Sequence, residues 1–282
     1  MSNILDGKKV SASVKEQVAL EVEKLKSEGI GVGLAVILVG DNPASKIYVA
    51  NKKKACEATG IKSFEYVLEE NTSEKELISL IETLNNEKSV NGILCQLPLP
   101  SHINEQAVIA AIAPEKDVDA FHISNVGRIM VGNFDFLPCT PAGIIEILDY
   151  YGIDIEGKNC VVIGRSNIVG KPMAMLLLHR NGTVTVCHSK TRNLKEITKT
   201  ADILVSAVGK AGFVTADMVK EGAAVIDVGM NRQDGKLCGD VCFDEVSEKA
   251  GYITPVPGGV GPMTIAVLMK NTLTAAKRQN GR

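Results

Sequence analysis

Residues 160–178 read CVVIGRSNIVGKPMAMLLL, and this stretch decides how the second half of the chain is interpreted. Its apolar start predicts a buried β-strand that ends at Gly164, and Pro172 is typical of the first turn of a helix. A strand, a turn and a helix N-terminus can hold a pyrophosphate, because backbone N–H groups and the helix dipole face the anion. Gly164 and Gly170 would let the backbone approach such a ligand closely.

Taken alone, this turn is weak evidence for a dinucleotide-binding site. Ser166 stands where the dinucleotide-binding pattern G-x-G-x-x-G has its second glycine, and a plain β–α turn would look similar. The surroundings favour a ligand, because further apolar runs predict parallel strands at residues 183–187, 203–207 and 223–228. The carboxyl ends of parallel strands are where α/β folds bind their ligands.

The residues after the predicted strand 183–187 favour NADP over NAD as that ligand. Enzymes that use NAD typically have an Asp or Glu here, which holds the ribose hydroxyls. This chain instead has His188, Ser189 and Lys190. Ser189, the nearby basic residues and Arg165 of the first turn suit a 2′-phosphate. The sequence leaves open whether NAD is also used.

The first half of the chain repeats the alternation of apolar runs and amphipathic stretches. The predicted strands are residues 33–40, 63–68 and 91–96, and the predicted helices are residues 10–29, 43–60, 73–85 and 105–112. Ser73 and Glu76 form a capping-box pattern at the start of one helix. The repetition predicts an α/β fold with mainly parallel, doubly wound sheets.

Two domains are expected. Residues 114–141 are rich in Asp, Gly, Asn and Pro and show weak periodicity, so we interpret them as the crossing between domains. Residues 1–120 would form an N-terminal α/β substrate domain, completed by a C-terminal helix at residues 262–282. Residues 140–261 would form a Rossmann-like dinucleotide-binding domain.

Composition narrows the classes of function. The net charge of -2 gives no reason to expect a nucleic acid or an anionic membrane surface as a partner. The longest apolar runs are too short to span a bilayer. Seven Cys at irregular spacing argue against a disulfide framework and fit a reducing cytosol. Cys238 and Cys242 have no second Cys/His pair nearby, so we expect no metal site.

The first half also carries a candidate substrate site. Tyr48 and Lys52 are four residues apart in ASKIYVANK, so they share one face of the predicted helix. Such a pair can polarise a bound group or move a proton if the Lys pKa is lowered, although a half-buried Tyr beside a solvated Lys would show the same spacing. Gln96 closes a predicted strand and Asp119 lies in KDVDAF, where the two could converge with that pair. The loop PVPGGVGPMT, residues 255–264, would lay backbone close to a flat ligand.

These segments resemble the bifunctional methylenetetrahydrofolate dehydrogenase/methenyltetrahydrofolate cyclohydrolase family. The resemblance is carried by VGDNPASKIYVANKKKA, GILCQLPLP, KDVDAFH, PCTPAG, VVIGRSNIVGKP and PVPGGVGPMT, which follow the family's order from about residue 39 to residue 264. Each motif alone is unspecific, whereas the set is highly specific. It implies two domains with a cleft between them, a homodimer formed through the nucleotide domain, and two reactions. These are NADP-dependent oxidation of methylenetetrahydrofolate to the methenyl cation and hydrolysis of that cation to formyltetrahydrofolate.

The resemblance also implies roles for residues. Lys52 would be the catalytic lysine, Tyr48 would pack against the folate, Gln96 would support Lys52, and Asp119 would hold the pterin ring. The expected substrate site further includes Ser45, Cys95, Leu97, Pro257, Gly258, Gly259 and Val260, and the expected cofactor contacts are Gly164, Arg165, Ser166, Gly170, Ser189 and Met230. We hypothesise that Lys52 is largely neutral and accepts a proton from the attacking water, because a fixed positive charge would oppose attack on a cation.

One position departs from the family, and two other interpretations stay open. Ala120 stands where relatives usually have Gly in DVDGF, so we expect altered affinity rather than lost activity. An amino-acid or shikimate-type dehydrogenase would share the two domains but would not need the loop 255–264. A nucleotide-binding scaffold without chemistry would not need Lys52 and Gln96.

Overall fold

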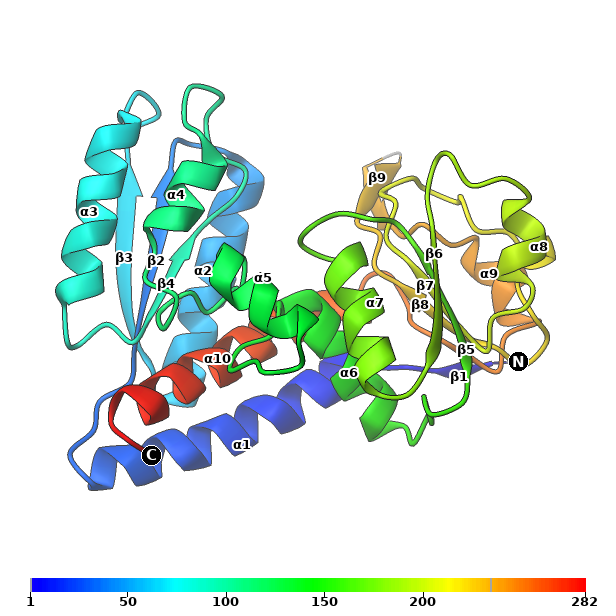
Figure 1. Ribbon diagram of the computed structural model, residues 1–282, viewed down its shortest axis with the longest axis horizontal. Coiled ribbons are helices and arrows are strands. Elements are labelled where there is room, and N and C mark those ends of the chain that lie inside the picture. The colour runs from blue at the N-terminus through cyan, green and yellow to red at the C-terminus, as the bar shows by residue number, and fades with distance from the viewer. Residues whose placement is uncertain (1, 234) are drawn as a thin grey trace. The chain divides into compact units, whose positions relative to one another are not determined.

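The computed structural model describes residues 2–233 and 235–282. The chain divides into two compact units, of which unit 1 comprises Met1–Ser11 and Pro138–Thr264, and unit 2 comprises Ala12–Leu137 and Ile265–Arg282. Two long helices, α1 (Gly7–Ser27) and α10 (Val260–Gln279), contribute residues to both units (Figure 1). Each unit is built on a parallel sheet of its own.

Within the described residues, unit 1 has a six-stranded parallel sheet in the order β1-β11-β8-β7-β5-β6. Its strands are β1 (Asn3–Ile4), β5 (Asn159–Ile163), β6 (Thr183–Cys187), β7 (Ile203–Ser206), β8 (Ala224–Asp227) and β11 (Tyr252–Ile253). Its other elements are α6 (Cys139–Tyr150), α7 (Gly170–His179), α8 (Leu194–Thr198), the 3-10 helix η1 (Ala216–Met218), the antiparallel pair β9 (Asn231–Gln233) and β10 (Lys236–Cys238), and α9 (Phe243–Ser247).

The strand order of unit 1 reverses at β5. β6 pairs with one side of β5 and β7 with the other, and Ile163 at the end of β5 is aligned with both Cys187 and Ser206. In α/β folds, ligands bind at the carboxyl ends of the strands beside such a reversal. The topology of unit 1 therefore points to this edge of the sheet.

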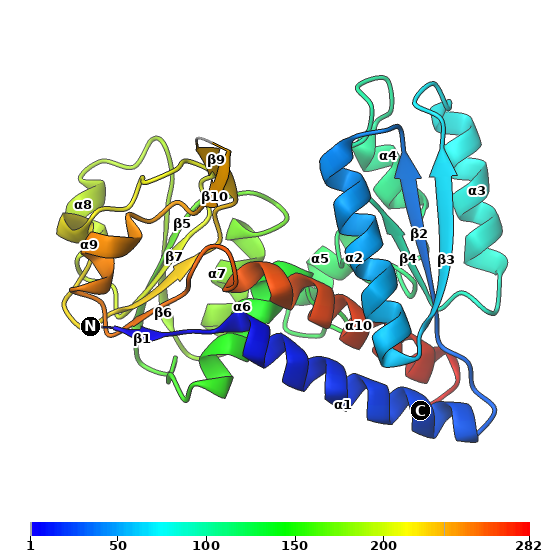
Figure 2. The same cartoon turned by 180° about the vertical axis from the view of Figure 1, so that it is seen from behind.

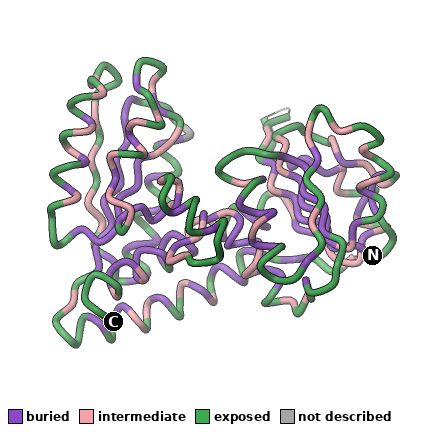
Figure 3. Tube along the Cα trace, in the orientation of Figure 1, coloured by how far each residue is buried: buried purple, intermediate pink, exposed green. Residues whose placement is uncertain are grey.

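The central strands of unit 1 are buried on both faces and mostly apolar. Every residue of β7 and β8 is buried, and Figure 3 shows the buried tube running along this sheet. Val161, Leu204 and Val225, from three neighbouring strands, belong to one core cluster. Burial on both faces is what a continuous apolar run in a parallel sheet predicts.

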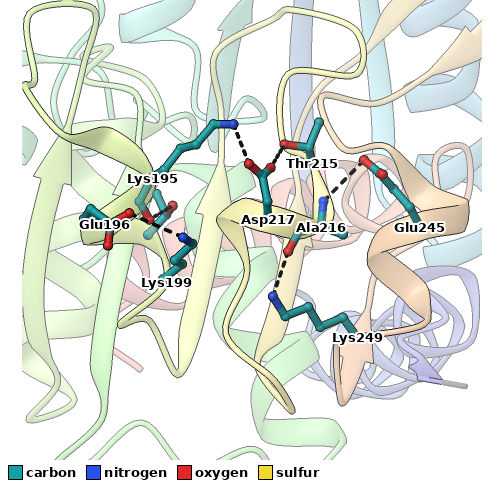
Figure 4. Close-up of polar contacts among 9 residues, drawn as sticks. Lys195, Glu196, Lys199, Thr215, Ala216, Asp217, Glu245 and Lys249 are labelled. Atoms are coloured by element: carbon teal, nitrogen blue, oxygen red, sulfur yellow. Dashed lines mark hydrogen bonds and ion pairs between the residues drawn. The ribbon is translucent and has the colours of Figure 1, made fainter.

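The flank of unit 1 beyond β7 is tied together by polar contacts (Figure 4). Lys195 of α8 forms an ion pair with Asp217 of η1. The Glu245 carboxylate, on α9, accepts a hydrogen bond from the N–H of Ala216 at 3.3 Å, and Lys249 donates one to the carbonyl of Ala216 at 3.0 Å. η1 is thus held between α8 and α9, which anchors the segment that follows the loop at the end of β7.

Unit 2 has, in the part of the chain that is described, a three-stranded parallel sheet in the order β3-β2-β4. Its strands are β2 (Gly33–Val39), β3 (Lys62–Leu68) and β4 (Gly92–Cys95), and its helices besides α1 and α10 are α2 (Pro43–Thr59), α3 (Glu74–Asn86), α4 (Glu105–Ala111) and α5 (Ile123–Met130). α2 runs beside β2 and β3, as Figure 2 shows. The central strand β2 is buried along its whole length.

The predicted α/β fold is confirmed, and most predicted elements lie within a few residues of their expected bounds. The capping box is confirmed: the N–H of Glu76 donates to Ser73 Oγ at 3.2 Å, and the N–H of Ser73 donates to the Glu76 carboxylate at 2.9 Å. Several short elements had no prediction: α5, inside the expected crossing at residues 114–141, the helical segments α8, η1 and α9, and the short strands β1, β9, β10 and β11. These strands have two or three residues each, too few to show a period.

The compact units divide the chain at other residues than the expected domains 1–120 and 140–261. The first residues join unit 1 because β1 pairs with β11. Residues 121–137 join unit 2, where Asn271 of α10 donates one hydrogen bond to the carbonyl of Val118 and another to that of Leu137. Among the described residues, no helix is long and apolar enough to cross a membrane.

Candidate functional site

The carboxyl ends of four strands in unit 1 finish at one edge of the sheet. The register aligns Ile163 with Cys187 and with Ser206, and Ser206 in turn with Asp227. The segments that follow these strand ends contain the expected cofactor contacts, which are Gly164, Arg165, Ser166, Gly170 at the start of α7, Ser189 and Met230. The sequence therefore predicted the correct strand ends, and the sheet brings their loops to one edge.

Two glycines make the turn after β5 possible. Gly164 has φ +129°, and a Cβ there would overlap the carbonyl oxygen of Ala207. A Cβ on Gly170 would overlap the backbone of Gly164. Gly170 begins α7, so these overlaps show that the helix start, the turn and the loop after β7 pack backbone against backbone.

The Ser166 hydroxyl binds backbone N–H groups where α7 begins. Its Oγ accepts hydrogen bonds from the N–H groups of Val169 at 3.2 Å and Gly170 at 3.3 Å. The hydroxyl thus performs a structural task at the position where the dinucleotide-binding pattern has a glycine. Arg165 and Ser166 are both exposed, so their side chains are accessible to a ligand at this edge.

The turn after β6 presents Ser189. The N–H of His188 donates to Thr191 Oγ1 at 2.8 Å, and the N–H of Thr191 donates to the carbonyl of His188 at 2.8 Å. These bonds close a tight turn in which Ser189 and Lys190 are exposed. The turn carries no acidic side chain, which leaves it suited to an anionic group.

Two buried carboxylates that the sequence analysis did not single out lie behind the loop after β8. Asp227 ends β8, and its carboxylate accepts hydrogen bonds from the N–H groups of Gly229 at 2.9 Å, Asp240 at 2.9 Å and Val241 at 3.0 Å. Asp240 is fully buried beside it. Burial, reinforced by the charge of Asp240, raises the pKa of the Asp227 carboxyl from 3.8 to about 6, although the three hydrogen bonds oppose this rise.

Asp227 predicts a pH-dependent stability. The unfolded chain releases this proton near pH 3.8, whereas the folded chain keeps it until about pH 6, so the free energy of unfolding falls as the pH rises through this window. From about pH 4 to about pH 7, the free energy of unfolding of the unmodified chain should fall by about 2 kcal/mol more than that of Asp227→Asn, because asparagine does not titrate. Urea unfolding of both chains at the two pH values measures the difference. An equal change with pH in the free energy of unfolding of both chains would contradict the raised pKa of Asp227.

The loop with Pro257, Gly258, Gly259 and Val260 belongs to unit 1 and leads into α10. The N–H of Gly259 donates to the carbonyl of Pro255 at 2.8 Å, and the N–H of Lys8 donates to the carbonyl of Gly258 at 3.2 Å. A Cβ on Gly7 would overlap the carbonyl of Gly259. The start of α1 therefore fixes the shape of this loop.

In unit 2 the expected catalytic lysine meets its expected partner. Lys52, on α2, is only 7% exposed, and its Nζ donates a hydrogen bond to Oε1 of Gln96 at 2.8 Å. Nε2 of Gln96 in turn donates to the carbonyl of Leu97 at 2.7 Å, which fixes the amide orientation. Tyr48, one helical turn before Lys52, is 38% exposed, and Ser45 at the start of the same helix is buried. The interpretation of Lys52 as a solvated surface residue is excluded by its burial.

Cys95 and Asp119 lie in the electrostatic neighbourhood of Lys52. Burial raises the pKa of the Cys95 thiol to about 12, and the charges of Asp119 and Glu105 add to this rise while that of Lys52 opposes it. Cys95 ends β4, directly before Gln96. Lys52, Cys95, Gln96 and Asp119 thus gather at the carboxyl end of β4.

Two residues without a predicted role hold Asp119 in place. The buried Asp117 accepts hydrogen bonds from the N–H of His122 and from Nδ2 of Asn125, both at 2.8 Å. Asn271 of α10 donates to the carbonyl of Val118 at 2.8 Å. The segment around Asp119 is therefore fixed by side chains on either side of it. Burial raises the pKa of the Asp117 carboxyl because it disfavours the charged form. The carboxyl thus stabilises this segment through its hydrogen bonds although its burial is unfavourable.

Ala120 stands in a strained conformation. Its φ is +57°, in the left-handed region, and the residue is fully buried. We expect Ala120→Gly to raise the free energy of unfolding by up to about 1 kcal/mol, because the strain of about 1–2 kcal/mol outweighs about 0.8 kcal/mol of methyl burial. Ala142→Gly, at a buried position in the helix α6, is the matched control. It should lower the free energy of unfolding by about 2 kcal/mol, from about 1 kcal/mol of helix propensity and about 0.8 kcal/mol of methyl burial. Urea unfolding measures both, and destabilisation by Ala120→Gly would contradict the strain.

Each unit gathers its own set of expected residues. Unit 2 brings together the side chains around Lys52, and unit 1 brings together the loops at the carboxyl edge of its sheet and holds the loop 255–260. Among the described residues, no group of three or more His, Cys, Asp or Glu could hold a metal ion. The chemistry on offer is thus that of a buried amine in one unit and of an anion-binding edge in the other.

Two family models match the chain. Residues 5–119 match the catalytic domain of tetrahydrofolate dehydrogenase/cyclohydrolase, and residues 138–280 match the NAD(P)-binding domain of the same family. The bifunctional protein FolD of Acetivibrio thermocellus is 62% identical over 279 residues, which cover 99% of this chain and 98% of that protein.

Solved structures agree with these matches. The bifunctional enzyme FolD, methylenetetrahydrofolate dehydrogenase/cyclohydrolase, from Campylobacter jejuni has a TM-score of 0.97 and 54% identity, covering 99% of this chain and 100% of that one. The N5,N10-methylenetetrahydrofolate dehydrogenase-cyclohydrolase from Trypanosoma brucei, in complex with NADP cofactor and an inhibitor, has a TM-score of 0.95 and 40% identity, covering 100% and 99% of the two chains.

Proposed function

Because the chain belongs to the tetrahydrofolate dehydrogenase/cyclohydrolase family, we propose that it is a bifunctional enzyme of one-carbon metabolism. It oxidises 5,10-methylenetetrahydrofolate with NADP and then hydrolyses the product to 10-formyltetrahydrofolate. The observation that carries this function is the contact of the buried Lys52 amine with Gln96, in the part of the chain that matches the family's catalytic domain.

The two steps conserve atoms and charge. The methylene carbon between two folate nitrogens loses a hydride to NADP⁺, which gives NADPH and the methenyl cation. Water then adds to the cationic carbon, one C–N bond breaks, and a proton is released with 10-formyltetrahydrofolate. The first step needs mainly orientation of the two ligands, whereas the second needs a group that accepts a proton from water.

Lys52 is the group we assign to the second step. In its neutral form the Lys52 amine can take the proton of the attacking water. Gln96 fixes the position of Nζ through the 2.8 Å hydrogen bond. Tyr48, half-exposed on the same helix, is placed to pack against the folate.

The remaining substrate contacts are assigned from the resemblance to the family. We assign Asp119 to the pterin ring, because a carboxylate can accept hydrogen bonds from the ring nitrogens. Ser45, Cys95 and Leu97 are the other folate contacts that we assign in unit 2. By the resemblance to the family, Pro257, Gly258, Gly259 and Val260 of unit 1 are assigned to folate as well. In this assignment unit 2 supplies the reacting groups.

Unit 1 binds the cofactor NADP. The pyrophosphate is assigned to the turn with Gly164, Ser166 and Gly170, beside the point where the strand order reverses. Arg165 and Ser189 take the 2′-phosphate, since both are exposed and the turn after β6 holds no acid. Met230, at the end of the neighbouring loop, borders the cofactor.

The assembly and location of the enzyme are also proposals. β6 ends the strand order of unit 1 and three of its five residues are exposed, so its edge is open for pairing with a second copy. Sedimentation equilibrium would distinguish this homodimer from a monomer. The seven Cys are all free thiols, which is consistent with the reducing cytoplasm.

The function is tested by mixing the purified chain with methylenetetrahydrofolate and NADP and following the absorbance of NADPH. We expect steady NADPH formation that depends on both ligands. Shikimate and amino acids, offered as alternative substrates, should give none. Absence of NADPH formation from the folate, with a folded chain that binds NADP, would contradict the proposed dehydrogenase.

A further inference from the structure

A buried carboxylate organises the carboxyl edge of unit 1. Asp240 follows β10 and is fully buried. Its Oδ2 accepts hydrogen bonds from the N–H groups of Val208 at 2.8 Å and Gly209 at 3.2 Å, and its Oδ1 accepts one from the N–H of Lys210 at 2.9 Å. Three consecutive N–H groups of the loop after β7 therefore converge on one side chain.

The same carboxylate also binds the neighbouring strand ends. Oγ of Ser206 donates to Oδ2 of Asp240 at 3.2 Å, and Nδ2 of Asn231 donates to Oδ1 at 3.0 Å. Ser206 ends β7, and Asn231 begins β9 directly after Met230. Asp240 thus links the loop after β7 to the loop after β8, and both loops border the edge assigned to the cofactor.

Little room is left around this link. A Cβ on Gly229 would overlap the Asp240 carboxylate, and a Cβ on Gly239 would overlap the Asp227 carboxylate. Asp227 in turn accepts the N–H of Asp240 at 2.9 Å. The Asp227 carboxylate therefore fixes the backbone at Asp240, and the Asp240 carboxylate in turn fixes the loop after β7.

We propose that Asp240 is a positioning residue for the dinucleotide, an inference that rests on the cofactor site proposed above. The loop at residues 207–210 forms no helix or strand, so its shape depends on where its N–H groups are bound. Because Asp240 is fully buried, it acts through this loop and through Asn231 rather than by touching the nicotinamide dinucleotide.

Asp240→Asn tests the proposal, because an NH2 group replaces one of the two acceptor oxygens. This NH2 group is a donor and cannot accept hydrogen bonds from the N–H groups that it faces. We expect the dissociation constant of NADP, measured by titration calorimetry, and KM for NADP to rise roughly 10- to 100-fold. Cyclohydrolase activity on methenyltetrahydrofolate uses no NADP and should stay within about twofold. A merely structural role would lower both activities together.

Asp202→Asn is the matched control. Asp202 also accepts a backbone N–H, that of Asn159 at 2.8 Å, and pairs with Lys220, but it lies at the opposite ends of these strands. NADP binding should be unchanged in this variant. If Asp240→Asn does not fold, as judged by circular dichroism, Asn231→Ala removes a single donor and should raise the NADP dissociation constant about three- to tenfold.

Unchanged NADP binding in folded Asp240→Asn, or in Asn231→Ala if the former does not fold, would overturn the proposal, as would equal losses of both activities. A failure of the proposed dehydrogenase function is distinguishable from a failure of the Asp240 proposal. The unmodified chain would then bind NADP without oxidising the folate, and the calorimetric comparison would still decide the role of Asp240.

Discussion

Lys52→Met should abolish most of the hydrolysis of methenyltetrahydrofolate while sparing hydride transfer. General acid–base groups contribute about 10²- to 10⁴-fold to rate, so cyclohydrolase kcat should fall by that factor. Dehydrogenase kcat should fall by no more than about tenfold, because hydride transfer depends on orientation of the ligands rather than on a proton acceptor. Methionine keeps much of the volume of the buried side chain, so the helix α2 should remain folded.

The control for this variant is the neighbouring lysine. Lys53 is exposed and forms an ion pair with Glu65 at 2.9 Å, so Lys53→Met should leave both activities close to those of the unmodified chain. Gln96→Leu removes the acceptor of the Lys52 hydrogen bond and should lower the cyclohydrolase rate to an intermediate value. Full cyclohydrolase turnover in Lys52→Met would refute the role of the amine.

The double variant Arg165→Ala with Ser189→Ala should turn cofactor preference from NADP toward NAD. Charge-assisted bonds to a phosphate contribute about 1.5–3 kcal/mol each, so KM for NADP should rise by ~10²-fold or more. NAD has no 2′-phosphate, so its KM should change by less than about threefold. Initial rates of methylenetetrahydrofolate oxidation with each cofactor measure the ratio.

Arg180→Ala provides the comparison. Arg180 is a cation at the other end of α7, where it pairs with Asp149, so its loss should leave the ratio of the two KM values unchanged. Equal rises of KM for NADP and NAD in the double variant would show that Arg165 and Ser189 do not select the cofactor.

Much of the site could be predicted because its residues are adjacent in sequence or repeat at helical spacing. Tyr48 and Lys52 share a helix face at four residues' distance, and Gly164 to Gly170 span a single turn. The pairing of Lys52 with Gln96 joins residues 44 positions apart, and it came from the resemblance rather than from any local pattern. Burial of Lys52 likewise follows from how α2 packs, which the local sequence does not state.

The residues that the sequence did not reveal act through the backbone of distant segments. Asp240 binds N–H groups about 30 residues away, and Asn271 binds a carbonyl 153 residues away. A lone Asp between Gly239 and Val241 looks like an ordinary turn former. Ala120 shows a related limit: its departure from the family glycine was visible, but its positive φ appears only in the fold.

Both reactions by one chain can be followed in a single experiment. The purified enzyme is mixed with methylenetetrahydrofolate and an excess of NADP, and NADPH, methenyl- and 10-formyltetrahydrofolate are quantified over time. We expect NADPH to equal the sum of the methenyl and formyl products, with the formyl product appearing far faster than in a protein-free methenyl control. NADPH formation with a methenyl pool that hydrolyses no faster than in that control would contradict the second activity and the role of Lys52.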